Sequence, residues 1–368
     1  MVTSRWACAV RVFAALLLAL TLPASAATYT WDGGTGANQL WSNADNWDAA
    51  GAPVSASTTT VVFAGTANLA NLNQNIASPF VLNRLATTAT AQTQAVSITG
   101  SPLRFEADGA TQPTLAHSRT QNLTVGNAIQ VPASTTLTLS NATWQMYLNG
   151  AITGDGSVRF STGGGGEMNF NSTGNAFTGG LFYTHTAGAN GQWGRLKIAA
   201  NALGNSTVAI SGGNLNPYHG TTNNQPGGLI LNGTATYAND FILGATSPIF
   251  ASEANGSGSN ITLNGNVDLQ AHSLYLRGGG TGRINGTISD SADASSLVKI
   301  DNGTWTLSGA NTYGGPTTIA AGTLAVSTLA NGGSPSAIGN SSNAASNLIF
   351  GGGTLRYTGG SASTDRKF

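Results

Sequence analysis

Hydrophobic and polar residues alternate in steps of two along several short stretches of this chain. The alternation is clear at residues 135–140, 260–263, 304–308 and 323–326, where hydrophobic side chains occupy every second position. A period of two is typical of a β-strand with one buried face. No stretch after residue 26 shows a convincing period of 3.6 residues. The pattern therefore predicts an all-β fold built from short strands.

Glycine-containing turns separate these stretches. An Asn-Gly pair follows a hydrophobic residue at four places, which begin at Asn149, Asn232, Asn264 and Asn285. Asn-Gly and Gly-Gly supply the backbone positions of positive φ that sharp turns need. We therefore expect these pairs to mark strand ends, with their glycines serving as positive-φ turn residues.

Longer segments of the chain repeat one another. Residues 297–326 resemble residues 151–182, and residues 337–355 resemble residues 202–215. A sandwich or barrel would pair its strands as hairpins, whereas approximate repeats with turn glycines favour a solenoid. The sequence therefore predicts a right-handed parallel β-helix over residues 66–368, with roughly 20–25 residues in each coil and on the order of 12 coils.

Residues 27–65 are predicted to form an N-terminal cap together with the first strands. They contain Trp31, Trp41 and Trp47, three of the seven tryptophans. The first coil of a solenoid exposes an apolar cross-section and unpaired strand edges, which an aromatic segment would cover. The alternative for the same three residues is a platform on which sugar rings stack.

The composition agrees with stacked strands and excludes several classes of protein. The chain has 368 residues, of which 50 are glycine and 8% are charged, and its formal net charge is zero. A nucleic-acid partner is not expected, because phosphate binding needs a basic surface. A helical bundle would need far more Ala, Glu, Lys, Leu and Arg.

Residues 1–26 have the layout of a secretory signal peptide. Arg5 and Arg11 precede an apolar run at residues 12–22, and a small-residue cleavage signal follows. We predict cleavage between Ala26 and Ala27, and hence a secreted or cell-surface protein exported by the general secretion pathway. Cleavage there would remove the single cysteine, Cys8. No transmembrane segment is expected after residue 26.

Residues 302–324 carry a resemblance to a known family. They read NGTWTLSGANTYGGPTTIAAGTL and resemble the autotransporter-associated β-strand repeat, also called the passenger-associated transport repeat. The usual form is GxGTLTLSGxNTYxGxTxIxxGTL. This sequence departs from it at Asp301, which stands in place of the first glycine, and at Trp305, which replaces a leucine.

The resemblance implies a bacterial, secreted or surface-exposed parallel β-helix. In autotransporters this repeat lies in the passenger, ahead of a C-terminal outer-membrane barrel. We interpret the sequence up to Phe368 as a fragment or a shortened product, whose outer-membrane association would depend on a missing C-terminal part. An intact short secreted protein is the alternative.

No catalytic, cofactor-binding or metal-binding residues are predicted. Two acidic groups are interpreted as solvated turn residues: Asp290, Asp293 and Asp301, and Glu106 with Asp108. Arg283 is the only candidate for a catalytic base near Asp290. The four histidines show no metal-binding spacing and are interpreted as surface or turn residues: His117, His185, His219 and His272. The glycine runs at 163–166 and 278–280 lack the residues of a phosphate-binding loop.

Two classes of function remain after this search. The first is a non-enzymatic, adhesin-like surface protein that presents its turns and loops to glycans or to other cells. The second is a carbohydrate-active enzyme or a glycan-binding protein on the same scaffold. The low charge and the lack of a carboxylate pair suited to hydrolysis favour the first class.

Overall fold

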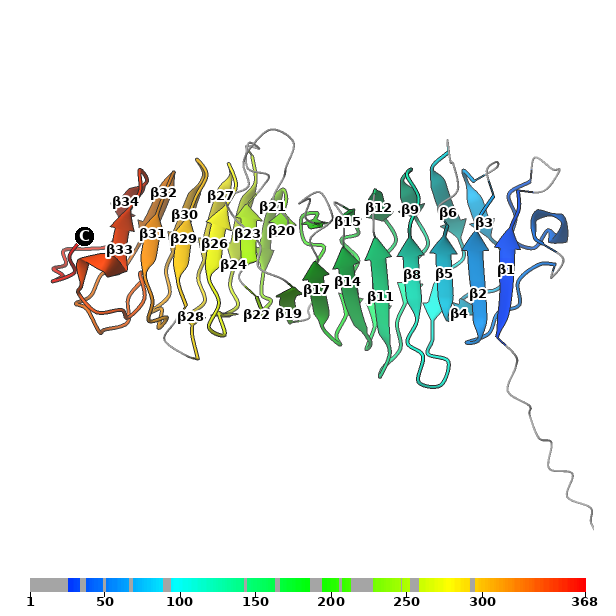
Figure 1. Cartoon of the computed structure of the whole chain (residues 1–368), viewed down its shortest axis with the longest axis horizontal. Coiled ribbons are helices and arrows are strands. Elements are labelled where there is room, and N and C mark those ends of the chain that lie inside the picture. Colours follow the sequence, from blue (N-terminus) through cyan, green and yellow to red (C-terminus); the bar gives the residue numbers. More distant parts are fainter. Residues whose placement is uncertain are drawn as a thin grey trace, which may run out of the picture.

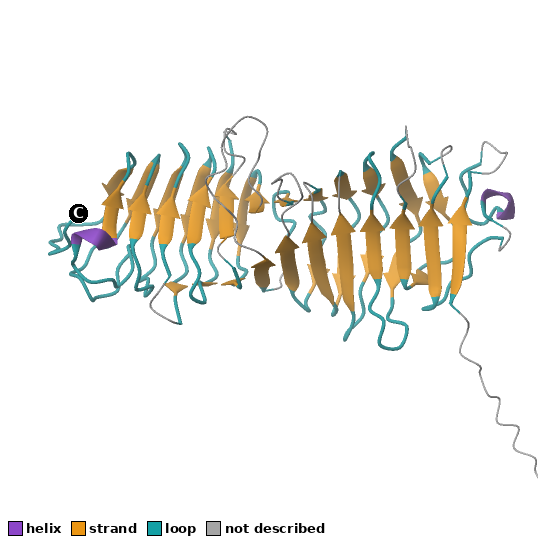
Figure 2. Cartoon of the chain, in the orientation of Figure 1, coloured by secondary structure: helices purple, strands orange, loops and turns teal. Residues whose placement is uncertain are grey.

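The computed structural model describes residues 26–33, 38–48, 51–65, 69–88, 94–141, 144–162, 166–185, 194–204, 207–212, 228–245, 247–251, 258–291 and 295–368. These residues form an elongated rod of stacked strands, with β1 at one end and β34 near the other (Figure 1). Two short 3-10 helices, η1 (Ala44–Asn46) and η2 (Ala345–Asn347), lie near the ends of the rod (Figure 2). The predicted export segment lies outside the described residues, apart from Ala26.

Two long sheets run along the rod. Sheet 1 has 11 strands: β1 (Ala27–Trp31), β2 (Thr59–Phe63), β5 (Arg84–Thr87), β8 (Thr114–His117), β11 (Thr136–Asn141), β14 (Ser157–Thr162), β17 (Leu181–His185), β19 (Val208–Gly212), β22 (Phe241–Leu243), β25 (Val267–Asp268) and β28 (Ile288–Ser289). Sheet 2 has 12 strands: β3 (Leu72–Gln74), β6 (Val96–Gly100), β9 (Leu123–Val125), β12 (Gln145–Leu148), β15 (Glu167–Phe170), β18 (Arg195–Ile198), β20 (Gly228–Leu231), β23 (Ser247–Ala251), β26 (Leu274–Arg277), β29 (Leu297–Lys299), β31 (Thr317–Ile319) and β33 (Leu348–Phe350).

Two shorter sheets share the third face of the rod. Sheet 3 belongs to the N-terminal half and has five strands: β4 (Phe80–Leu82), β7 (Leu103–Phe105), β10 (Ile129–Gln130), β13 (Ile152–Gly154) and β16 (Ala176–Phe177). Sheet 4 belongs to the C-terminal half and has six strands: β21 (Thr234–Tyr237), β24 (Asn260–Leu263), β27 (Thr281–Ile284), β30 (Thr304–Leu307), β32 (Thr323–Val326) and β34 (Thr354–Tyr357).

Through most of the rod the chain visits sheet 1, sheet 2 and the third face in turn, and then repeats this path one coil further along. After β28 the strands alternate between sheet 2 and sheet 4. The ladders of all four sheets are parallel. This arrangement confirms the predicted all-β parallel solenoid. Because the coils stack, residues one coil apart in sequence become direct neighbours.

Inward-facing side chains form continuous hydrophobic stacks along the rod. One stack in sheet 1 has one buried residue in each of eight successive strands, all in register. Its members are Val61, Leu85, Leu115, Leu139, Phe160, Tyr183, Ile210 and Leu243. Neighbours in this stack are 21 residues apart at Leu139 and Phe160 but 33 apart at Ile210 and Leu243. The coils thus keep one register in the core while differing in length at their corners.

The Asn-Gly pairs lie at corners of the solenoid, but three of their four glycines are required for a reason other than the predicted one. Only Gly233 has a positive φ, of 81°. At Gly150, Gly265 and Gly286 a Cβ atom would overlap a backbone carbonyl of the preceding coil. The glycines therefore allow adjacent corners to approach closely, and the expectation of positive φ was wrong for these three.

The position of the Asn-Gly corner changes along the rod. Asn149 and Asn232 follow strands of sheet 2 and precede the third face. Asn264 and Asn285 follow strands of sheet 4 and precede sheet 1, and Asn285 Nδ2 donates to Asn264 Oδ1 at 2.8 Å. The Asn-Gly pair therefore lies before the third face at Asn149 and Asn232, and one corner further along the coil at Asn264 and Asn285.

The three N-terminal tryptophans are enclosed in the first coil. Trp31 and Trp41 are fully buried and Trp47 is 4% exposed. Trp47 packs edge-on against both of the others, with ring centroids 5.1 Å and 5.7 Å apart, and its Nε1 donates to Trp41 O at 2.9 Å. Leu40 extends sheet 2 through a parallel bridge to Asn73. Buried ring faces cannot stack on a sugar, which removes the basis of the platform interpretation.

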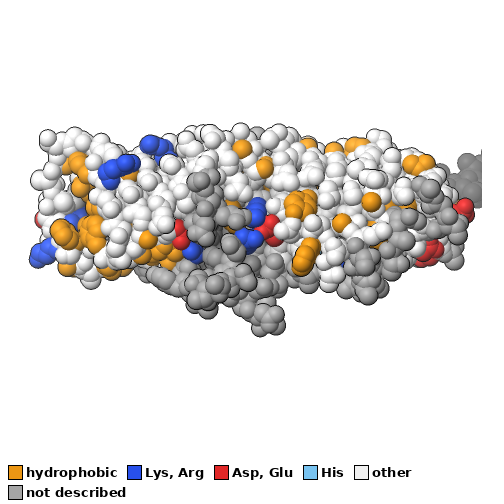
Figure 3. Space-filling view, turned by 90° about the horizontal axis from the view of Figure 1, so that it is seen from above, with side chains coloured by type: hydrophobic (Ala, Val, Ile, Leu, Met, Phe, Trp, Pro, Cys, Tyr) orange, Lys and Arg blue, Asp and Glu red, His pale blue; other side chains and the backbone are white. Residues whose placement is uncertain are grey.

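The surface is mostly uncharged. Figure 3 shows one face of the rod on which blue and red side chains are sparse among white atoms. Within the described ranges there is no helix that combines the length and the apolar character needed to cross a membrane.

Candidate functional site

The third face of the solenoid is interrupted at one place. Sheet 3 ends at β16 and sheet 4 begins at β21, and the intervening described turn at residues 199–204 contributes no strand to either sheet. Sheets 1 and 2 continue past this point through β17, β18, β19 and β20. We call this interruption the junction.

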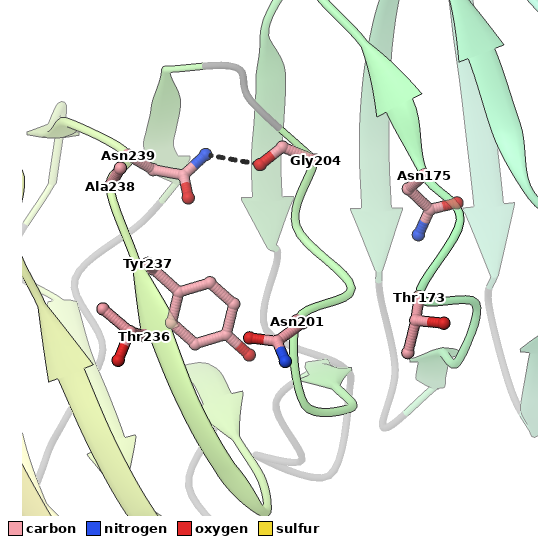
Figure 4. A pocket seen from close by; sticks show the side chains of 8 residues that line it. All are labelled: Thr173, Asn175, Asn201, Gly204, Thr236, Tyr237, Ala238 and Asn239. Atoms are coloured by element: carbon pink, nitrogen blue, oxygen red, sulfur yellow. Dashed lines mark hydrogen bonds between the residues drawn. The ribbon is translucent and has the colours of Figure 1, made fainter.

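Two buried asparagines hold the turn at the junction in place. Asn175 Nδ2 donates to Ala202 O at 2.7 Å, and Asn175 Oδ1 accepts from Ile152 N at 2.8 Å. From the other side, Asn239 Nδ2 donates to Gly204 O at 3.2 Å (Figure 4). The turn is thus attached to both halves of the rod by side-chain amides.

A pocket of about 520 Å³ opens above this turn. We call it the junction pocket; the described residues that line it are Thr173, Asn175, Asn201, Gly204, Thr236, Tyr237, Ala238 and Asn239 (Figure 4). None of these residues carries a formal charge at neutral pH. Thr173, Asn201 and Thr236 are exposed, so their polar groups are accessible at its mouth.

Tyr237 forms a buried wall of the junction pocket. Its hydroxyl group donates to Ala199 O at 3.1 Å, and burial raises its pKa to about 12. The phenol therefore stays protonated at physiological pH and serves as a hydrogen-bond donor rather than as a base. The described lining provides amide and hydroxyl groups for binding, but no group suited to proton transfer near neutral pH.

The acidic residues considered from the sequence are engaged in turns and ion pairs. Asp301 pairs with Arg277 through two bonds of 3.0 Å and accepts from Gly278 N at 2.9 Å. Asp290 accepts from Ser295 N at 2.8 Å. For Asp301, the interpretation as a solvated turn residue was wrong, because its carboxylate is neutralised by Arg277 and largely buried.

Glu106, Asp108 and Arg283 lie in other turns and strands of the rod. Glu106 pairs with Arg104, and Asp108 forms a backbone bridge with Thr111. The Arg283 guanidinium donates to Ser308 Oγ at 3.5 Å. Asp293 lies outside the described residues.

His117 was wrongly assigned to the surface or to a turn. It ends strand β8, is 1% exposed and shares a 2.7 Å hydrogen bond between its Nδ1 and Thr87 Oγ1. In the ladders of sheet 1, His117 pairs with Thr87 on one side and with Asn141 on the other. Burial, with the nearby Arg119 charge adding to it, lowers the pKa of His117 to about 4. The imidazole is therefore a neutral part of the core at physiological pH.

Of the other histidines, only the side chain of His272 lies within the described residues. His272 lies in a half-exposed turn and donates its backbone N–H to Leu269 O at 2.7 Å. His185 ends β17, although its side chain is outside the described parts, as is the whole of His219. Among the described residues, no group of three His, Cys, Asp or Glu side chains could hold a metal ion.

A charged cluster on sheet 2 could not be found from the sequence pattern. Glu167 in β15 pairs with Arg195, its direct neighbour in β18, and its Oε2 lies 3.1 Å from Lys197 Nζ. Glu167 is only 5% exposed. These residues are 28 and 30 positions apart, so only the length of this particular coil brings them together.

The two departures from the repeat consensus have structural explanations. Asp301 takes the left-handed conformation, with φ of 63°, at the position where the consensus has glycine. Trp305 is fully buried, donates from Nε1 to Arg277 O at 2.9 Å and lies directly opposite Gly282 in the neighbouring strand β27. The missing side chain at Gly282 makes the space that the indole fills.

The repeated segments also share a hydrogen-bond pattern. Asn311 matches Asn175: its Oδ1 accepts from Ile288 N at 2.8 Å, and its Nδ2 donates to Ala337 O at 2.9 Å. The same asparagine thus connects three successive coils in both copies, which supports the repeat seen in the sequence.

Comparison with known proteins agrees with this repeat. Residues 297–326 match the family model described as the passenger-associated-transport-repeat. This match supports the resemblance to an autotransporter-associated repeat that residues 302–324 carry.

The chain is also similar to a curated adhesin. It is 39% identical over 173 residues to the adhesin BmaC autotransporter of Brucella suis biovar 1 (strain 1330). The matched region covers 44% of this chain and 5% of that relative, so the chain spans only a small part of its length. No solved structure matches the chain.

Proposed function

We propose that this chain is an adhesin-like passenger segment that acts outside the cell by presenting a rigid binding surface. The observation that carries the proposal is the similarity to an autotransporter adhesin, together with the passenger-associated-transport repeat. The parallel solenoid supports it, because stacked coils make a long rod whose sides can face a partner. Glycans or other cells are the partners that suit such a surface, and nucleic acid is not, given a net charge of zero.

The roles of the charged groups favour binding over catalysis. A glycosidase needs two carboxyl groups about 5–10 Å apart, one of them able to exchange a proton. In the described chain, Asp301 and Glu167 are instead neutralised by Arg277 and Arg195. The junction pocket contributes only neutral amide and hydroxyl groups among its described lining.

We further propose that residues 1–26 direct export by the general secretion pathway and are removed between Ala26 and Ala27. Strand β1 begins at Ala27 and pairs with β2 along its whole length, from Ala27 opposite Thr59 to Trp31 opposite Phe63. A chain that starts at Ala27 would therefore keep the complete first strand. N-terminal sequencing of the exported protein tests this, and a retained Met1 would contradict it.

The adhesive role is tested with the exported chain coupled to beads. We expect the beads to bind cultured host cells or a glycan-coated surface more strongly than beads carrying the same protein after heat unfolding. Equal binding by the native and unfolded proteins would contradict the proposal. Incubation with a panel of polysaccharides tests the enzymatic alternative, because released reducing or unsaturated ends would show catalysis.

A further inference from the structure

A second hollow adjoins the junction pocket. A second hollow of about 360 Å³ lies beside it and shares Asn201 and Thr236 with it. The described residues that line the second hollow are Asn201, Thr234, Ala235, Thr236, Asn260 and Thr262. The two hollows therefore form one groove that runs from the junction onto β21 and β24, the first two strands of sheet 4, in the direction in which the coils stack.

The lining of this groove selects against charged and apolar ligands. A charged ligand would lose water without gaining an opposite charge from any described lining residue. An apolar ligand would cover the amide of Asn201 and the hydroxyl of Thr236 without giving them partners, which is also unfavourable. A ligand that carries many neutral hydroxyl groups exchanges its hydrogen bonds with water for bonds to these side chains.

We propose that the groove at the junction binds a neutral oligosaccharide. The junction pocket has the volume of a small-molecule site, and the second hollow extends it in one direction. This shape fits a linear chain of sugar units better than a single sugar. The inference rests on the proposed adhesive function, and it names the class of ligand and the place where it binds.

Asn201 is the residue best placed to contact such a ligand. It lies where the two hollows meet, is exposed and has a φ of 59°, a conformation that asparagine tolerates better than most residues. Its side-chain amide has no hydrogen-bond partner within the part of the chain that the structure describes. The amide can therefore offer one acceptor and two donors to a ligand.

Thr236 provides the second contact on the opposite wall. It lies on β21, between Ala235 and Tyr237, whose side chains are buried, so its own side chain points outward. β21 is the first strand of sheet 4 and has a partner only in β24, which leaves its other edge facing the junction. A hydroxyl on this rigid strand keeps a fixed position relative to Asn201.

The test uses the exported full chain and a panel of neutral oligosaccharides of three to six units, made of glucose, mannose, galactose or N-acetylglucosamine. Binding is measured by calorimetry, beside acidic oligosaccharides and an unrelated extended peptide. We expect at least one neutral oligosaccharide to bind. N201G keeps the left-handed backbone and removes the amide, and T236V keeps the shape and removes the hydroxyl. Each variant is expected to weaken binding by about tenfold.

Matched controls are available on the same rod. S134G replaces another exposed residue of positive φ, 62°, and T281V replaces an exposed threonine of sheet 4 outside the groove. Both should bind like the unmodified chain. No binding to the neutral panel, a preference for the acidic sugars or the peptide, or neutral binding unchanged in N201G and T236V would each overturn the inference.

The same variants separate this inference from the proposed function. If the bead assay shows adhesion that N201G and T236V leave intact, the chain is an adhesin that binds elsewhere. If a neutral oligosaccharide binds at the groove but the beads do not adhere, the binding site stands and the adhesive role fails.

Discussion

The pairing of Gly282 with Trp305 gives the sharpest test of how this solenoid is packed. A Cβ atom added at Gly282 would lie 2.5 Å from the Cδ2 and Cε3 atoms of Trp305. Ordinary contacts of this kind are about 3.5–4 Å, so one side must move by about 1 Å. The indole cannot move outward easily, because it is fully buried and bonded to Arg277 O at 2.9 Å.

The expected cost of G282A follows from this overlap. Overpacking a core typically costs about 1–3 kcal/mol, and we expect a value near 3 kcal/mol, since the clash is with the rigid ring. W305L removes part of the ring, leaves Arg277 O without its donor and should cost about 2–3 kcal/mol. In the double variant the new methyl group enters the space that the indole vacates. The two changes should therefore compensate each other by about 1–3 kcal/mol.

The four proteins of this cycle are compared by urea denaturation followed by circular dichroism, and by amide hydrogen exchange in β27, β30 and β32. G126A is the control, because a Cβ atom there would have its nearest neighbours at an ordinary 3.4 Å. If the costs of G282A and W305L simply add, the two residues do not share one space and the packing argument fails.

Three further predictions concern two buried side chains, His117 and Lys299, and one corner glycine, Gly150. Because the pKa of His117 is about 4 when folded and about 6.5 when unfolded, the unfolded chain binds a proton first as the pH falls. The free energy of unfolding should therefore fall by roughly 3 kcal/mol between pH 6.5 and pH 4. H117N keeps a polar group beside Thr87 and should lose this pH dependence in urea denaturation at several pH values. Burial lowers the pKa of Lys299 to about 8, from 10.5 in the unfolded chain. The free energy of unfolding should therefore rise between pH 8 and pH 10.5, because the unfolded chain holds the proton longer. A rise of the same size in K299M would show that Lys299 is not its source. G150A should destabilise the chain by more than about 2 kcal/mol, since its Cβ overlaps Asn127 O, whereas G174A, whose Cβ would be 3.3 Å from the Ala151 side chain, should cost much less in thermal unfolding.

The alternation of residues was enough to predict the strands, and the approximate repeats with their turn glycines were needed to predict the solenoid. Leu137 and Leu139 point inward on β11 as the pattern indicates, and the same holds for Trp305 and Leu307 on β30. The period-two rule could also have placed His117, because it lies two residues after the buried Leu115 and so shares its face. A polar side chain can thus belong to the core when the alternation places it on the inward face and a partner such as Thr87 satisfies it.

The junction pocket could not be derived from local sequence. It brings together Thr173 and Tyr237, which are 64 residues apart, and their proximity depends on the length of every corner between them. The same is true of Glu167 and Arg195, which pair only because their coil has 28 residues. Local alternation fixes which side of a strand faces inward, but it carries no information on corner length. Contacts between coils therefore emerge only from the three-dimensional register.

The interruption of the third face bears on how the rod should unfold. In a stacked array, stability is approximately a sum of terms within each coil and terms between neighbours. At the junction the neighbour term is carried by sheets 1 and 2, and on the third face by the amide bonds of Asn175 and Asn239 instead of a strand ladder. Coupling between coils should be weakest there. A pulling force, or gradual addition of denaturant, should therefore unfold the two halves in separate steps, each as a block.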